Sequence, residues 1–219
     1  MKIAILGYGK MGQAIERIAL QRGHEIILKT NSQNPADTAD FSAVEVAIDF
    51  STPDTAFSNI SSALTQGIPV ISGTTAWLEK QTEAEQLAME NNTAFLYASN
   101  FSIGVNLFFE LNKKLAQLMS NHEQYQASMK EVHHIHKLDA PSGTAISLAE
   151  DMQGEIHIES ERTGEVPGTH IITYQSGIDS IEIKHEAHNR QGFALGAVLA
   201  AEWIKDKKGV FSMSDMLNL

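Results

Sequence analysis

The sequence predicts an α/β protein with two domains, a doubly wound parallel sheet followed by an α+β domain built on a mixed sheet. Over the first hundred residues, short apolar runs alternate with segments of helical period, which is the rhythm of strand–helix–strand units. Further along, polar and apolar residues alternate, as is typical of half-exposed antiparallel strands. This change of pattern predicts a domain boundary.

Five short strands are expected in the first domain, because each is a nearly continuous apolar or β-branched run of the kind that a parallel sheet buries on both faces. They span residues 2–6, 25–28, 46–50, 69–71 and 94–97. Helices are expected between them at residues 11–22, 55–66 and 78–90. Acidic residues near the start of the last segment favour a helix N-terminus.

The second domain is expected to begin with a helix at 105–119 and to continue with strands at 126–132, 155–159, 170–175 and 180–185. In the last strand Ile181, Ile183 and His185 fall on one face, as a half-exposed antiparallel strand requires. A closing helix at 193–204 is apolar enough to pack back on the first domain. We therefore expect residues 1–103 with 191–219 to form one domain and 104–190 the other.

Composition excludes several classes of function. The formal net charge is −11 and no block of Lys or Arg offsets it, which argues against a nucleic-acid partner. Cysteine is absent, so thiolate nucleophiles and cysteine-based metal sites are excluded. The N-terminal apolar run is too short for a signal peptide, and no apolar stretch approaches the ~18 residues of a membrane span. We expect a cytoplasmic protein with no membrane partner.

Residues 7–12 form the first motif, Gly-Tyr-Gly-Lys-Met-Gly, directly after the first strand and at the start of the first helix. Here the glycines permit a tight turn and a close backbone approach, and the helix N-terminus offers N–H groups to a pyrophosphate. The motif predicts a Rossmann-like dinucleotide site, although a structural tight turn fits the same residues. The expected contacts are Gly7, Tyr8, Gly9, Lys10, Met11 and Gly12.

The end of the second strand bears on the choice of cofactor. An acidic residue ~20 residues after the glycines normally binds the ribose hydroxyls of NAD, but this strand ends in Leu28-Lys29-Thr30. Lys29 is suited to the 2′-phosphate of NADPH, or it is a solvated surface charge. We predict NADPH or NADH as cofactor, with a preference for NADPH as a hypothesis.

Two further turns follow predicted strands, Asp-Phe-Ser-Thr-Pro at 49–53 and Ser-Gly-Thr-Thr at 72–75. Open α/β sheets bind ligands at the carboxyl ends of their strands, and small hydroxyl residues can line a nicotinamide and ribose pocket there. Ordinary turn and N-cap residues explain the same segments equally well.

Residues 131–145, Glu-Val-His-His-Ile-His-Lys-Leu-Asp-Ala-Pro-Ser-Gly-Thr-Ala, combine proton-exchanging and cationic side chains with a helix start. Three histidines and Lys137 lie within five residues, and the N–H groups of Gly143 and Thr144 would be free to bind a carboxylate. Histidine exchanges protons near neutral pH, whereas lysine adds fixed charge. The motif predicts a site for a small anionic substrate that is protonated during the reaction.

Other interpretations of this motif compete. Single histidines are usually structural or solvated. A metal site of His133, His134 and His136 lacks a spacing such as HExxH, and strand alternation would place His133 and His134 on opposite faces. We therefore expect no metal.

The motif at 131–145 closely resembles the signature of the dihydrodipicolinate reductase family. Further segments resemble family segments in the same order, namely residues 7–12, 49–53, 72–75, 98–106, 162–164 and 166–168. The resemblance covers essentially the whole chain. It implies an oxidoreductase that reduces 4-hydroxy-tetrahydrodipicolinate, a small dicarboxylate, to tetrahydrodipicolinate and water in lysine and diaminopimelate biosynthesis, with NADH or NADPH.

The resemblance also implies roles for matching residues. His133 resembles the family's proton donor and Lys137 its catalytic lysine. The implied substrate contacts are His134, Ser142, Gly143, Thr144 and Arg190. The cofactor contacts expected beyond the first motif are Lys29 and Phe50 at strand ends and, by resemblance, Gly73, Thr74, Thr75, Ser99, Asn100, Phe101 and Ser102. A homotetramer is implied, with residues 104–190 as the substrate-binding and oligomerisation domain.

The chain departs from longer family members in a short segment at 31–44, at Lys29-Thr30, and in the lack of a longer hairpin between Tyr174 and Ile181. Cofactor preference and the oligomer interface therefore follow less directly from the resemblance. An amino-acid semialdehyde dehydrogenase of the phosphorylating type is disfavoured by the missing thiol. A nicotinamide sensor without turnover would not need the cluster at 131–145.

Overall fold

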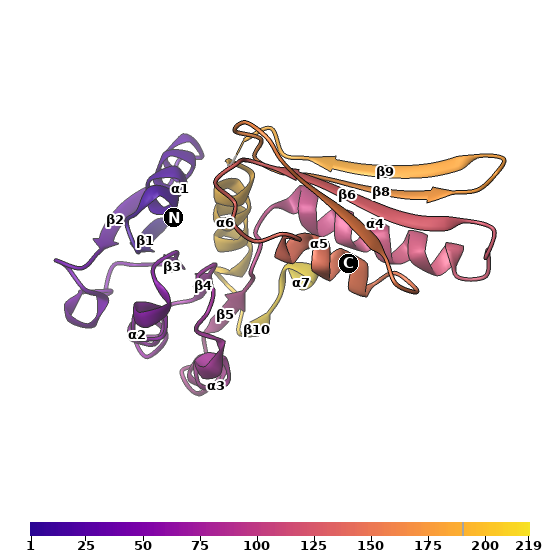
Figure 1. Ribbon diagram of the computed structural model, residues 1–219. Helices are drawn as coiled ribbons and strands as arrows, with labels where there is room; N and C mark the ends of the chain where they lie inside the picture. The colour runs from indigo at the N-terminus through magenta and orange to yellow at the C-terminus, as the bar shows by residue number, and fades with distance from the viewer. Residues whose placement is uncertain (190) are drawn as a thin grey trace. The chain divides into compact units, whose positions relative to one another are not determined.

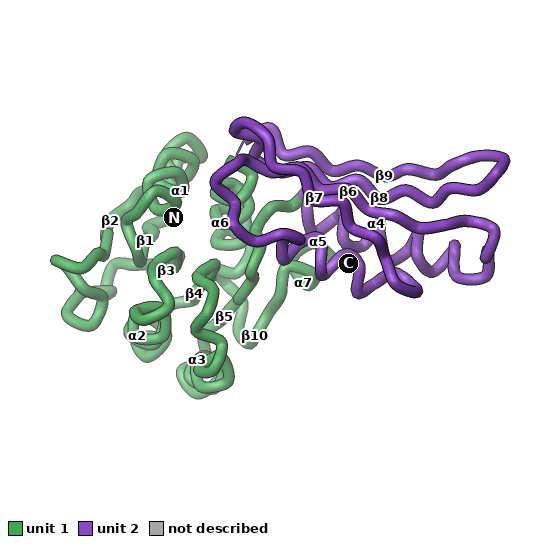
Figure 2. The backbone as a smooth tube through the Cα atoms, in the orientation of Figure 1, with its two compact units in different colours: residues 1–103, 191–219 green, residues 104–190 purple. Residues whose placement is uncertain are grey.

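The computed structural model describes residues 1–189 and 191–219, and the chain forms two compact units (Figure 2). Unit 1 comprises Met1–Ile103 and Gln191–Leu219, and unit 2 is Gly104–Arg190. The predicted fold class is confirmed, with a parallel six-stranded sheet in unit 1 and a mixed four-stranded sheet in unit 2.

The sheet of unit 1 has the strand order β10-β5-β4-β3-β1-β2, and its strands pair in parallel (Figure 1). The strands are β1 (Lys2–Leu6), β2 (Glu25–Thr30), β3 (Val46–Asp49), β4 (Val70–Ser72), β5 (Ala94–Tyr97) and β10 (Gly209–Phe211). The chain runs from β1 to β2 on one side and then returns to β3 on the other, so the order reverses at β1. Loops that leave β1 and β3 diverge there and open a crevice at the carboxyl ends of the strands.

Helices cover both faces of this sheet because successive strand residues point to opposite sides. In β1, Ile3 and Ile5 join one core with α1 (Lys10–Gln21) and α6 (Gln191–Ile204). Ala4 and Leu6 join the other core with α2 (Pro53–Leu64) and α3 (Gln81–Glu90). Burial of each large aliphatic side chain contributes roughly 1.5–3 kcal/mol, so both layers stabilise the sheet.

Unit 2 contains a sheet with the order β7-β6-β8-β9, in which β6 pairs in parallel with β7 and antiparallel with β8. Its elements are α4 (Ile103–Met119), β6 (Gln126–His133), α5 (Gly143–Glu150), β7 (His157–Arg162), β8 (Thr169–Gln175) and β9 (Ser180–Glu186). A core of residues such as Phe108, Leu148 and Ile172 joins both helices to the sheet. In register, β6 sets His133 opposite Arg162 and Glu131 opposite His170.

The predicted elements differ from the observed ones at their ends, and some short elements were not predicted. The helix expected at 78–90 begins as a 3-10 turn, Leu78–Lys80, before α3. The helix expected from 55 begins at Pro53, because Thr52 forms a capping box with Thr55. The three-residue β10 and the short α7 (Met213–Leu217) were not predicted. In the part of the chain that the structure describes, no helix is long and apolar enough to cross a membrane.

Candidate active site

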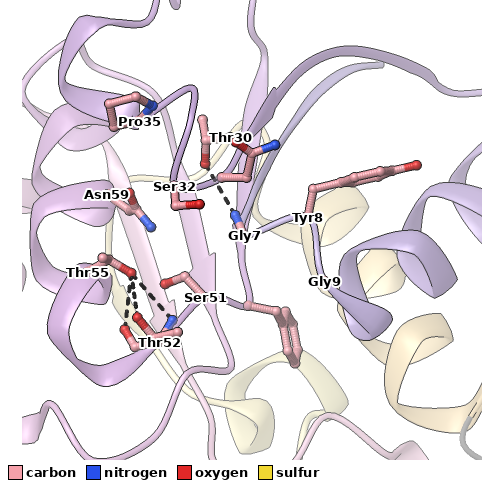
Figure 3. A pocket seen from close by; sticks show the side chains of 12 residues that line it. Gly7, Tyr8, Gly9, Thr30, Ser32, Pro35, Ser51, Thr52, Thr55 and Asn59 are labelled. Carbon is pink, nitrogen blue, oxygen red and sulfur yellow. Dashed lines mark hydrogen bonds between the residues drawn. The ribbon is translucent and has the colours of Figure 1, made fainter.

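A pocket of about 620 Å³ opens in unit 1 where β1 and β3 end (Figure 3). Of the predicted cofactor contacts, Gly7, Tyr8, Gly9 and Phe50 line it. Ser51 and Thr52, from the 49–53 turn that the sequence analysis considered for this role, also line it. The wall is completed by Thr30, Asn31, Ser32, Pro35, Thr55 and Asn59. The volume is within the range of small-molecule and cofactor sites.

The three glycines of the first motif have three different surroundings. Gly7 has φ +94°, and a methyl group on it would lie 2.4 Å from the Phe50 carbonyl oxygen, so only glycine allows this turn. A methyl group on Gly12 would lie 2.5 Å from the Gly7 carbonyl oxygen, where α1 crosses β1. Beside Gly9 no described atom lies within 4 Å of such a group. This arrangement fits a pyrophosphate that approaches Gly9 at the start of α1.

Lys29 is paired within its own unit. Its Nζ lies 2.5 Å from Glu16 Oε1 and 4.5 Å from the centre of the Tyr8 ring. The Tyr8 hydroxyl donates a hydrogen bond to the same Glu16 carboxylate. The hydrogen bond to Glu16 raises the pKa of Lys29, and the one from Lys29 lowers the pKa of Glu16. The cation that was expected near a 2′-phosphate therefore has a neighbouring countercharge.

A buried carboxylate joins the two predicted loops. Asp49 accepts hydrogen bonds from the hydroxyls of Ser51 (2.6 Å), Ser72 (2.8 Å) and Thr74 (2.8 Å). Burial raises the pKa of Asp49, and these hydrogen bonds act against the rise. Thr74 thus faces Asp49 and links the two loops through it.

The remaining predicted cofactor residues do not line this pocket. The Phe50 ring covers Gly73 and lies 5.6 Å from the ring of buried Phe101. Lys10 and Met11 begin α1, Thr75 and Ser99 are exposed, and Asn100 Oδ1 accepts a hydrogen bond from the Ser102 backbone N–H (2.9 Å).

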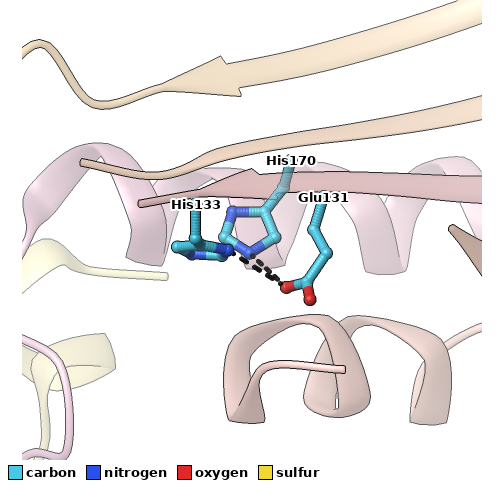
Figure 4. Close-up of side chains that lie close together, drawn as sticks. All are labelled: Glu131, His133 and His170. Carbon is cyan, nitrogen blue, oxygen red and sulfur yellow. Dashed lines mark ion pairs between the residues drawn. The ribbon is translucent and has the colours of Figure 1, made fainter. Parts of the chain in front are cut away.

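In unit 2, three ionisable side chains meet where β6 ends (Figure 4). Glu131 and His133 are two residues apart on one face of β6, and His170 lies on the neighbouring β8. All three are buried. His133 Nδ1 lies 3.4 Å and His170 Nε2 lies 3.8 Å from Glu131 Oε2, and the two imidazole rings meet edge to face at 5.1 Å.

Fixed donors hold the Glu131 carboxylate from its other side. Arg162 Nη2 donates to Oε1 (2.9 Å), and the Ser142 backbone N–H donates to both oxygens (3.1 and 3.2 Å). Burial alone would raise the pKa of Glu131, but the hydrogen bonds from Ser142 and Arg162 outweigh it and lower the pKa to about 2. Glu131 is therefore an anion at neutral pH.

The two imidazoles respond mainly to burial. Burial lowers the pKa of His133; Glu131 opposes this effect, whereas Lys137 and Arg162 add to it. Burial and then the charge of His133 lower the pKa of His170 to about 4. At neutral pH His170 is uncharged, so the fixed charges of the cluster are those of Glu131 and Arg162.

Lys137 lies in the loop after β6, with its Nζ 2.8 Å from Asp139 Oδ2. Ser142 is the N-cap of α5, and its Oγ accepts from the Ala145 N–H (3.2 Å) and lies 3.3 Å from His170 Nε2. Exposed Gly143 and half-buried Thr144 form the first turn of α5. His134 is half-buried, and Arg190 lies outside the described residues.

The cluster also bears on metal binding. Possible ligand atoms of Glu131, His133 and His170 lie within 4.8 Å of one another. This set differs from the metal site of His133, His134 and His136 that the sequence analysis considered. However, Arg162 already supplies the countercharge of the carboxylate at 2.9 Å. A divalent cation beside that guanidinium would be repelled, so the donors suit a proton better.

Glu131, Arg162 and His170 were not predicted to be site residues. Glu131 had a signal, since it shares a strand face with His133. Arg162 and His170 reach the cluster only through the pairing of β6 with β7 and β8.

Comparison with known proteins supports one family over both units. Residues 1–101 match the model for the N-terminus of dihydrodipicolinate reductase and residues 104–217 the model for its C-terminus. A 4-hydroxy-tetrahydrodipicolinate reductase of Christiangramia forsetii is 49% identical, covering 100% of this chain and 98% of that protein. One of Thermosipho africanus is 35% identical, covering 99% and 98%. The solved dipicolinate-bound dihydrodipicolinate reductase of Paenisporosarcina shares the fold, with a TM-score of 0.77, 23% identity and 97% of each chain covered.

Proposed function

The chain belongs to the dihydrodipicolinate reductase family, and from this premise we propose how its residues carry out the reaction. It is an NAD(P)H-dependent 4-hydroxy-tetrahydrodipicolinate reductase of lysine and diaminopimelate biosynthesis. The reaction consumes substrate, NAD(P)H and a proton and yields tetrahydrodipicolinate, NAD(P)⁺ and water. One observation carries the assignment of residues. His133 is buried at the end of β6, it can exchange a proton, and Lys137 follows four residues later in the loop that leads to α5.

His133 is the proposed proton donor. The pocket around Gly7 and Gly9 is the proposed site of the dinucleotide, and its nicotinamide supplies the hydride when it is bound. Protonated His133 delivers its proton as charge develops on the substrate ring. Lys137 and the N–H groups of Gly143 and Thr144 hold the carboxylates, and the lysine stabilises the developing charge.

A coupled assay with the synthase product tests this proposal. His133→Ala and Lys137→Ala should each lower kcat at least about 100-fold while cofactor affinity stays within about threefold. His136→Ala and Lys113→Ala are matched controls, because both side chains are exposed and pair with surface carboxylates. Near-normal turnover of both active-site variants would refute the roles, and absence of NADPH and NADH oxidation by the native protein would refute the function.

Both cofactors are expected to serve. The pocket wall near the end of β2 contains Thr30, Asn31 and Ser32, which are neutral. Glu16 offsets the charge of Lys29, so the lysine adds little to binding of a 2′-phosphate. We expect kcat/KM for NADPH and NADH to differ by less than about tenfold, a difference worth ~1.4 kcal/mol. A preference of 100-fold for NADPH would restore Lys29 as a direct phosphate ligand.

We also propose that unit 2 mediates assembly into a homotetramer. The hairpin between β8 and β9 exposes Ile178 (96%), and β9 exposes Ile181 (40%). Exposed aliphatic side chains on one hairpin favour contact with another chain. Light scattering should give a mass of about four times 24.0 kDa, and a monomer mass would exclude the assembly.

A further inference from the structure

We propose that Glu131 is a positioning residue for His133. Its carboxylate attracts the proton on Nδ1 of the imidazole, so Nε2 is the atom that delivers a proton to substrate. This inference rests on the proposed role of His133 and deepens it. In this inference Glu131 and His133 act as a carboxylate–imidazole pair during the reaction, and the neighbouring His170 is uncharged.

The first support is the position of the carboxylate. Arg162 and the Ser142 N–H hold Glu131 on one side, at 2.9 to 3.2 Å, and they are fixed by β7 and by the start of α5. Glu131 Oε2 is left facing His133 Nδ1 at 3.4 Å. An ion pair with Arg162 alone explains a buried carboxylate, but it does not require the second oxygen to face an imidazole.

The second support is the surroundings of the two ring nitrogens. Nδ1 of His133 is buried and makes no hydrogen bond to any described residue, and the Glu131 carboxylate lies 3.4 Å from it, so the attraction between them is electrostatic. Nε2 faces Gly168, where an added methyl group would lie 3.1 Å away. A proton on Nδ1 is stabilised by the carboxylate, so Nε2 carries the proton that is lost and regained. The glycine keeps the space beside Nε2 free of a side chain.

The third support comes from His170. Its Nε2 lies 3.3 Å from Ser142 Oγ and farther, at 3.8 Å, from Glu131. Because its pKa is about 4, it is neutral at pH 7 and brings no positive charge that would compete for the carboxylate. The negative charge of Glu131 therefore acts on His133, as in other pairs in which a carboxylate orients a catalytic imidazole.

The effect on pH dependence follows from all the charged groups that face His133. These are Glu131 on β6, Arg162 on β7, His170 on β8, and Lys137 and Asp139 in the loop after β6. Glu131→Gln removes an anion and leaves two cations, so the pKa of His133 should fall. Since the protonated form is the active one, kcat should decline with rising pH at a lower pH than in the native enzyme.

The closing experiment measures kcat and KM against pH for the full-length enzyme with the synthase product and NADPH. For Glu131→Gln we expect the alkaline decline to move down by about one pH unit or more, and kcat at pH 8 to fall about tenfold or more, with KM within about threefold. Glu131→Asp keeps the charge and should restore the position of the decline. Glu159→Gln, a surface carboxylate paired with Lys130, is the matched control.

A profile of Glu131→Gln that matches the native one would overturn the inference. Nitrogen-15 NMR of the native enzyme tests it without any variant, with the His133 signals assigned by their loss in His133→Asn. The neutral ring should carry its proton on Nδ1, and a ring protonated on Nε2 would equally overturn it. Failure of the proposed function is a separate outcome, because it appears as an inactive native enzyme or an active His133→Ala.

Discussion

Lys137, the proposed ligand of a substrate carboxylate, already binds a carboxylate of its own chain. Its hydrogen bond to Asp139 lowers the pKa of Asp139, and the Gly143 N–H contributes to the same shift. The Lys137 ammonium and the Gly143 N–H are two of the groups that we propose bind the substrate carboxylates. Asp139 therefore competes with an incoming dianion for the same donors.

Asp139→Asn should strengthen binding of a dicarboxylate probe such as dipicolinate by about two- to fivefold, the range expected for an exposed ion pair of 0.2–1 kcal/mol. Isothermal titration calorimetry at pH 7 measures the change. Weaker binding would mean that Asp139 organises the loop and does not compete. Asp206→Asn, far from this loop in sequence, controls for the lost charge.

His170 should make stability depend on pH. Its pKa falls from 6.5 to about 4 on folding, so between these values the unfolded chain binds a proton that the folded protein does not. The free energy of unfolding is therefore unaffected by this group above pH 6.5 and decreases as the pH falls toward 4, with a slope of up to about 1.4 kcal/mol per pH unit.

His170→Gln keeps a partner for Ser142 but cannot titrate. Urea unfolding at pH 4.5, 5.5, 6.5 and 7.5 should give a shallower loss of unfolding free energy for this variant than for the native protein. Equal slopes would show that His170 is charged when folded or already perturbed when unfolded.

The sequence grouped candidate site residues only where they are contiguous in the chain. His133, Lys137 and Ser142 stand within one segment, so their grouping needed no knowledge of the fold. Arg162 and His170 belong to other strands, and their place depends on the register of β6 with β7 and β8. Strand register is set by packing across the sheet, which a single sequence does not reveal.

At the scale of elements, the turn from β1 into α1 contains one glycine that packing requires, Gly12, and one that we assign to cofactor binding, Gly9. A methyl group on Gly12 would meet the Gly7 backbone at 2.5 Å, whereas one on Gly9 would meet no described atom within 4 Å. Gly12→Ala should therefore cost about 1–3 kcal/mol of stability, as overpacking does. Gly9→Ala should leave the melting temperature nearly unchanged but weaken NADPH binding about tenfold or more.

Thermal unfolding and fluorescence titration with NADPH measure the two effects on the same samples. Unchanged affinity in a folded Gly9→Ala variant would place the pyrophosphate elsewhere. Ala14→Gly, within α1, is the control for a change in helix stability. Gly23→Ala would not serve, because Gly23 has φ +82° and alanine would strain the backbone there.

The elements that the sequence predicted are those with strong apolar periodicity. All five expected strands and the helices between them are present. The missed β10 has three residues and lies at a sheet edge, with Gly209 and half-buried Phe211. So short a segment carries too few positions for a pattern, and it forms because β5 offers an unpaired edge.

At the scale of the whole molecule, unit 1 is built from both ends of the chain. Helix α6 packs against β3, β4 and β5 and against α1. It covers Ile48, Ile71 and Leu96, which are fully buried. Exposure of three such side chains costs roughly 1.5–3 kcal/mol each, which is comparable with the roughly 5–15 kcal/mol that keeps a domain folded.

Removal of residues 191–219 should therefore unfold unit 1 even though β1 to β5 and the glycine motif remain in the chain. We expect loss of NADPH binding and of the cooperative thermal transition of unit 1. Supplying residues 191–219 as a separate polypeptide should restore part of the binding, since the lost contacts are packing contacts and need no covalent link. Full NADPH affinity in the truncated chain would show that α1, α2 and α3 suffice to hold the sheet, and that the C-terminal segment only adds to an already stable unit.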